Sequence, residues 1–235
     1  RSIMLSSLAS LFSSLSFIAA TTVGAEEKMK IVASFSILGD MVEQVVGEHA
    51  SITTIVGPDA DARIYQPSIA DARSVADADV IFVNGLGFET WSETLIAKSG
   101  TKGSVHVATE NITPILIDGE VDPHAWNSPR NGIVYVTNIA TVLKKKMPEH
   151  AEAISANTTS YVEKLKALDL ETKASLAELA PDKRTVITAH DAFGYLADCL
   201  IWPIGYAEPS MFILRLPGTT CRRIRLRGSC LQMSR

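Results

Sequence analysis

Hydrophobic residues fall into two alternating patterns along the first half of the chain. Short continuous apolar runs, such as Lys30–Ile37 (KIVASFSI) and Asp79–Asn84 (DVIFVN), are typical of strands buried on both faces. Each run is followed by a segment whose apolar residues share one helical face. The predicted strands are 30–37, 51–56, 79–84 and 105–108, and the predicted helices are 38–46, 68–78 and 89–97. This alternation predicts an α/β fold with a mainly parallel sheet covered by helices.

The pattern changes between Pro148 and Ala180 to one long stretch with helical spacing. The apolar residues of this face are Ile154, Tyr161, Leu165, Leu168, Leu176 and Leu179. A helix of about 30 residues spans roughly 45 Å, which is long enough to join two lobes. Two ordinary helices broken near Asp169 are the alternative.

A second α/β lobe begins after this helix but does not continue convincingly. Arg184–Ala189 (RTVITA) has the strand pattern again, and His190–Leu196 (HDAFGYL) is expected to open the next helix. Beyond Asp198 we find no second βα repeat, and Arg222–Arg227 (RRIRLR) differs in composition from everything before it. We expect an incomplete or aberrant carboxy-terminal lobe, and translation in a shifted reading frame is our hypothesis for the tail.

Residues 1–25 have the composition of a signal peptide. They contain no acidic residue, and an apolar stretch leads into Val23-Gly24-Ala25 ahead of two glutamates, which suits cleavage after Ala25. No cysteine stands at that point, so we expect a soluble periplasmic protein of a double-membraned bacterium rather than a lipid-anchored one. A buried amino-terminal helix is the alternative.

Charge and cysteine usage narrow the classes of function. Residues 26–206 hold 25 acidic and 15 basic residues, a formal charge of −10, whereas residues 207–235 carry +5. The acidic main part disfavours nucleic acid as a partner and is compatible with a cation. Cys199, Cys221 and Cys230 form no C-x-x-C pair, so they predict neither a structural zinc site nor a disulfide framework.

Two histidines are candidates for metal ligation. His124 directly follows a proline that restricts the local backbone, and Trp126 lies two positions on. His190 stands where a predicted strand ends and a helix begins, which is where open α/β sheets place ligand sites. Neutral imidazole suits Zn²⁺. For either histidine alone, an ordinary hydrogen-bonded loop residue is the alternative.

Four collinear motifs resemble those of one family. They are residues 57–68 (GPDADARIYQPS), 83–89 (VNGLGFE), 122–126 (DPHAW) and 189–195 (AHDAFGY). They are similar to successive signatures of the zinc and manganese substrate-binding proteins of bacterial ABC importers, the periplasmic solute-binding proteins of family 9 with the cluster A-I fold. The resemblance covers about residues 28–198.

The resemblance implies two α/β lobes joined by one long backbone helix, with a metal held between the lobes by four side chains. Applied to this chain, it divides residues 26–147, 148–180 and 181–206 into the amino-terminal lobe, the linking helix and the start of the carboxy-terminal lobe. Residues 207–235 are a tail that does not match the family. His124 and His190 carry over as metal ligands, and the late aspartate ligand is not identified.

Arg63 occupies the position of the family's first histidine ligand. A guanidinium is always cationic and offers no lone pair, so it cannot bind Zn²⁺. Asp59, Asp61 or Glu89 are possible replacements without further support. Ser36, Tyr65 and Trp126 are expected to line the cleft or to orient the ligands by hydrogen bonding, with simple packing as the alternative.

The expected function is therefore a periplasmic, monomeric receptor that captures Zn²⁺ or Mn²⁺ and delivers it to an ABC permease in the inner membrane. It is not an enzyme. His190, rather than glutamate, favours zinc. A zinc hydrolase is disfavoured because no H-E-x-x-H spacing is present. A metal-independent adhesin or a non-functional remnant is the alternative that the incomplete second lobe supports.

Overall fold

The computed structural model describes residues 27–117, 119–179, 185–188, 190–199, 204–206 and 212–215. The expected signal peptide at 1–25 and most of the tail at 207–235 lie outside the described residues. None of the described helices is long and apolar enough to cross a membrane.

The amino-terminal half is built on a four-stranded sheet in the order β2-β1-β3-β4. Its strands are β1 (Met29–Phe35), β2 (Ala50–Val56), β3 (Val80–Val83) and β4 (Ser104–Val107). All three pairings are parallel, which confirms the predicted sheet. Every residue of β3 is buried, as expected for a central strand covered on both faces.

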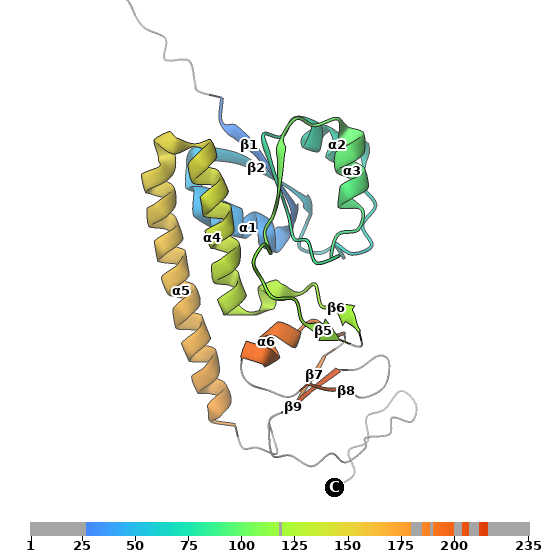
Figure 1. The fold of residues 1–235 in the computed structure, drawn as a ribbon, viewed down its shortest axis with the longest axis vertical. Coiled ribbons are helices and arrows are strands. Elements are labelled where there is room, and N and C mark those ends of the chain that lie inside the picture. Colours follow the sequence, from blue (N-terminus) through green and yellow to red (C-terminus); the bar gives the residue numbers. More distant parts are fainter. Residues whose placement is uncertain are drawn as a thin grey trace, which may run out of the picture.

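Three helices follow the strands of this sheet. They are α1 (Ser36–Val46), α2 (Ile69–Ala76) and α3 (Ser92–Ser99), and the short 3-10 helix η1 (Gly47–His49) leads from α1 into β2. The start of α2 is set by a capping box, in which the Ser68 and Asp71 side chains each accept from the other's backbone N–H. Figure 1 shows α1 on one side of the sheet and α2 with α3 on the other.

Two long helices form a hairpin against α1. The first, α4 (Pro129–Lys146), was not predicted from the hydrophobic pattern; its buried stripe consists of Tyr135, Val136, Ile139, Ala140 and Leu143. After the 3-10 helix η3 (Pro148–His150), the second, α5 (Ala151–Ala177), runs unbroken for 27 residues. The single long helix is therefore confirmed, and a break near Asp169 is wrong.

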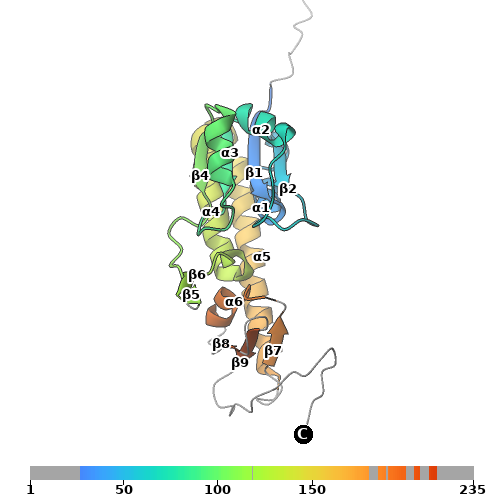
Figure 2. The same cartoon turned by 90° about the vertical axis from the view of Figure 1, so that its right-hand side faces the viewer.

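The carboxy-terminal elements lie at the far end of α5 from the parallel sheet, as Figures 1 and 2 both show. They are β7 (Thr185–Thr188), α6 (Gly194–Cys199), β8 (Ile204–Tyr206) and β9 (Phe212–Arg215). The strands pair antiparallel in the order β7-β9-β8. The sequence pattern predicted neither β8 nor β9. This three-stranded sheet therefore differs from the amino-terminal sheet, whose pairings are all parallel.

A short hairpin links the two regions. Its strands are β5 (Leu116–Ile117) and β6 (Glu120–Val121), paired antiparallel. The DPHAW motif follows β6 directly, and the 3-10 helix η2 (Ala125–Asn127) then leads into α4. His124 therefore stands between the hairpin and η2, and η2 contacts α6.

Candidate metal centre

The His124 imidazole is buried and its orientation is fixed by Asp122. Only 4% of His124 is exposed. One carboxylate oxygen, Oδ1 of Asp122, accepts from the His124 backbone N–H at 2.9 Å and lies 2.8 Å from Nδ1 of the ring. Because a carboxylate accepts, Nδ1 carries the proton, and the lone pair is left on Nε2. This is the tautomer that a metal-binding imidazole needs.

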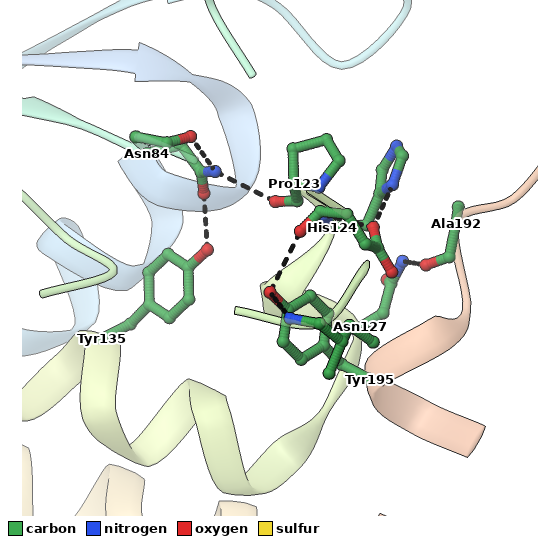
Figure 3. Close-up of polar contacts among 10 residues, drawn as sticks. Asn84, Pro123, His124, Asn127, Tyr135, Ala192 and Tyr195 are labelled. Atoms are coloured by element: carbon green, nitrogen blue, oxygen red, sulfur yellow. Dashed lines mark hydrogen bonds and ion pairs between the residues drawn. The ribbon is translucent and has the colours of Figure 1, made fainter. Parts of the chain in front are cut away.

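Asn84 holds the same loop to the parallel sheet. Its Nδ2 donates to the backbone carbonyl of Pro123 at 3.0 Å, and its Oδ1 accepts from the hydroxyl of Tyr135 on α4 (Figure 3). Asn84 and Tyr135 are both fully buried. Burial raises the pKa of Tyr135, so its hydroxyl stays a proton donor. The end of β3, the loop and α4 are thus joined through one amide.

The His190 segment is held against the His124 loop by two side chains. Nδ2 of Asn127 donates to the backbone carbonyl of Ala192 at 2.6 Å, and the Tyr195 hydroxyl donates to that of Asp122 at 3.0 Å (Figure 3). As a result the two imidazoles meet edge to face, with ring centroids 5.3 Å apart. The structure therefore brings together the two histidines that were predicted as ligands.

Gly194 makes this approach possible. A Cβ atom at this position would lie 2.4 Å from Oδ2 of Asp122 and 2.8 Å from Cδ1 of Ile115. Any side chain here would push α6 away from the carboxylate. Within the described part of the chain, Oδ2 of Asp122 is buried without a hydrogen-bond partner.

Burial and charge act on the protonation of His190. Burial lowers its pKa, and the neighbouring His124 and the Arg63 guanidinium lower it further, against the smaller opposite effect of Asp191 and Asp61. The neutral imidazole is therefore favoured. Neutral imidazole is the form that binds a metal ion.

Arg63 shares a cavity of about 420 Å³ with His124 and Asp191. Its side chain forms an ion pair with Asp61, with Nη2 3.2 Å from Oδ2 and Nε 3.3 Å from Oδ1. Both side chains are about two-fifths exposed, at 42% and 41%. The structure thus places a cation at the edge of the histidine pair.

The carboxylates considered as replacement ligands are engaged elsewhere or exposed. Asp61 is paired with Arg63, and Asp59 is exposed. Glu89 is buried and accepts from Ser34 Oγ at 2.6 Å and from the backbone N–H groups of Asn84 and Gly85. Burial raises the Glu89 pKa. Among the described residues, no group of three or more His, Cys, Asp or Glu side chains is arranged to hold a metal ion.

Comparison with known proteins decides the family. The family model described as zinc-uptake complex component A, periplasmic (ZnuA), matches residues 31–200. The chain belongs to this family. The predicted resemblance is therefore confirmed.

Curated relatives of this ZnuA-family chain are metal-binding proteins. The iron-binding protein YfeA of Yersinia pestis is 34% identical over 189 residues, covering 76% of this chain and 60% of YfeA. The manganese-binding lipoprotein MntA of Halalkalibacterium halodurans is 35% identical over 173 residues, covering 73% and 58%. The chain thus spans about three-fifths of the length of these relatives.

Solved structures agree with the ZnuA assignment. The manganese-bound periplasmic metal binding protein from Candidatus Liberibacter asiaticus is 31% identical with a TM-score of 0.69, covering 74% of this chain and 66% of that one. The Zn(II)-bound ZnuA-like domain of Streptococcus pneumoniae AdcA is 29% identical with a TM-score of 0.66, covering 74% and 64%. The parallel sheet and long helix are those of the cluster A-I fold of periplasmic metal binding proteins.

The three predicted supporting residues of this ZnuA-family chain lie in different places. Trp126 packs edge-on against His124, with ring centroids 5.3 Å apart, and against Phe35 at 4.9 Å. Tyr65 lies on the loop that carries Arg63, and its hydroxyl donates to Asp71 in α2 at 2.9 Å. Ser36 lines a separate groove beside α1 and β2. Trp126 alone of the three is in ring contact with a predicted ligand in the described structure.

The residues that position the two histidines were not predicted from the sequence. Asp122 and Asn84 both lie within motifs that were recognised, directly before Pro123 and at the end of a predicted strand. Asp122, two positions before His124, was a usable signal, because a metal-binding imidazole usually donates its other N–H to a carboxylate or carbonyl. Asn127 and Tyr195 act through tertiary contacts, for which the sequence carries no local signal.

Proposed function

We propose that this chain is the substrate-binding receptor of a metal ABC importer, with His124 and His190 as metal ligands. The observation that carries the proposal is the ring contact of these imidazoles, with centroids 5.3 Å apart, while Nδ1 of His124 is engaged by Asp122 and Nε2 keeps its lone pair. The receptor captures Zn²⁺, or Mn²⁺ as the second choice, and delivers it to a permease in the inner membrane. It catalyses no reaction and acts as a monomer in the periplasm.

The metal preference follows from the donor atoms. Two neutral imidazoles suit Zn²⁺, whereas Mn²⁺ is harder and prefers carboxylate and water oxygens. Iron and manganese appear in the names of the relatives YfeA and MntA. In this chain position 190 is a histidine rather than a glutamate, so the pair supplies two nitrogen ligands. This favours zinc.

We also propose the following division of the chain. Residues 1–25 are the export signal, residues 26–147 the amino-terminal lobe, residues 148–180 the linking helix, and residues 181–206 the start of a carboxy-terminal lobe that is incomplete or aberrant. Residues 207–235 do not match the family, whose model ends its match at residue 200. Closure of the two parts over the ion is the expected binding motion.

Calorimetric titration with Zn²⁺ and Mn²⁺ tests the proposal. The chelator-treated chain is expected to bind Zn²⁺ more tightly than Mn²⁺, and His124→Ala and His190→Ala are each expected to abolish measurable binding. His49→Ala is the matched control, because His49 stacks on His150 at the other end of the helical hairpin and lies outside the cavity. Unchanged affinity in both ligand variants would overturn the assignment.

A metal-independent remnant is the second candidate, and one observation favours it. Arg63 places a cation beside the histidine pair, where a divalent ion would be repelled. The variant Arg63→His separates the two candidates. A receptor gains zinc affinity from the added imidazole, whereas a remnant binds no zinc in either form.

A further inference from the structure

Arg63 has binding capacity that its ion pair does not use. A guanidinium carries five N–H donors in a planar fork. Asp61 accepts from Nε and from one N–H of Nη2, at 3.3 and 3.2 Å. Three donors are therefore not used by Asp61, and the residue lines the cavity that also contains His124.

The histidine pair alone leaves a metal ion with open coordination positions. Zinc usually takes four ligands. The described residues contain no third His, Cys, Asp or Glu arranged with the pair. A bound species that carries its own oxygen ligands could occupy the remaining positions.

We propose that this cavity, with His190 in ring contact with the His124 that lines it, is where a divalent metal binds together with a small carboxylate chelator, the metal on His124 and His190 and the chelator on Arg63. This deepens the proposed function and rests on it. A carboxylate matches the guanidinium fork through paired N–H···O bonds. It also supplies oxygen ligands to the open positions of the metal, and its attraction to both cations offsets the repulsion between Arg63 and the ion.

The acidic residues of the cavity favour the chelate over a free anion. Asp191 and Glu120 line the same cavity and would repel a polycarboxylate that arrives alone. The bound metal offsets much of the charge of the chelator. The chain is therefore expected to bind the anion only together with the metal.

Equilibrium dialysis with radiolabelled citrate as the probe tests this inference. The chain is expected to retain one citrate per Zn²⁺ and to retain little citrate without zinc. Arg63→Gln is expected to weaken zinc-dependent citrate retention by about tenfold to a hundredfold, because it removes charge-assisted hydrogen bonds. It should leave zinc binding without citrate unchanged or improved.

Arg73→Gln is the matched control, since Arg73 is an exposed arginine in the last turn of α2. This variant should retain citrate as the unaltered chain does. Zinc binding without citrate retention would overturn the inference and leave the proposed function standing. Citrate retention that is independent of zinc would overturn it as well. If zinc binds neither with nor without citrate, the proposed function itself fails.

Discussion

The two histidines are held by regions of very different construction. His124 belongs to a part with a continuous core, in which Phe82, Leu38 and Ile139 are each at most 1% exposed. His190 belongs to a short segment that is tied to that part through Asn127 and Tyr195. Half of the candidate site is thus built into the protein core, and the other half is docked onto it. Substitutions in the two regions should therefore have different signatures.

The largest effect is expected from Phe82→Ala in the core. Removing a fully buried aromatic side chain typically costs about 3–5 kcal/mol of unfolding free energy. The loss should appear in urea denaturation followed by circular dichroism. Zinc binding should fall only in proportion to the fraction of unfolded chain. If zinc affinity drops while stability is unchanged, the core does not act as proposed.

A smaller and more selective effect is expected from Asp122→Ala. This change removes the acceptor of Nδ1, so the imidazole of His124 is no longer held in one tautomer and orientation. Loss of such a partner typically lowers metal affinity by about tenfold to a hundredfold. Calorimetric titration with Zn²⁺ measures it. Asp77→Ala, which removes an exposed carboxylate at the end of α2, is the comparison and should leave zinc affinity unchanged.

Gly194→Ala should loosen the docked half without touching the core. The added methyl group would overlap Oδ2 of Asp122, and overpacking of this kind costs about 1–3 kcal/mol. We expect weaker zinc binding and faster proteolysis of the segment around residues 190–199. The urea transition of the amino-terminal part should stay in place. A shift of that transition would mean that the two regions unfold as one unit.

The smallest effect is expected from Tyr195→Phe. It removes the hydrogen bond to the Asp122 carbonyl, which is worth about 0.5–1.5 kcal/mol. Amide hydrogen exchange should become faster in α6 and stay unchanged in β1 and β3. Equal amide exchange in Tyr195→Phe and in the unaltered chain would show that the Asn127 hydrogen bond alone is enough to hold the His190 segment.

The sequence predicted the region with the continuous core better than the docked one. The strands and helices from Met29 to Val107 were expected because apolar runs alternate with helical faces. Helix α4 was missed, although Pro129 at its first turn and the buried stripe through Leu143 were visible signals. Its β-branched residues and Gly132 have weak helix propensity, and packing against α1 and α5 compensates for this.

Only part of the docked region could be derived from local patterns. β7 lies within the strand predicted at 184–189, and α6 begins within the helix predicted at 190–196. β8 and β9 were not predicted, because β9 is a strand by pairing antiparallel with β7 and β8 by pairing antiparallel with β9. Such pairing depends on the tertiary fold rather than on the local hydrophobic pattern. The histidine pair was expected through the family resemblance. The hydrogen bonds of Asn127 and Tyr195, which bring His190 to His124, join residues far apart in the sequence and have no local signature.

The position of Asn84 bears on the order in which an ion would leave. The Asn84 amide ties the His124 loop to both β3 and α4. When the two imidazoles separate, we therefore expect the His190 segment to move more than the His124 loop. Under the proposed ligation, the bond to His190 would be the first to break, and the ion would stay for a moment on His124 alone. The residence time of zinc should accordingly follow the strength of the docking contacts, and the rate of capture should follow the access to Nε2 of His124.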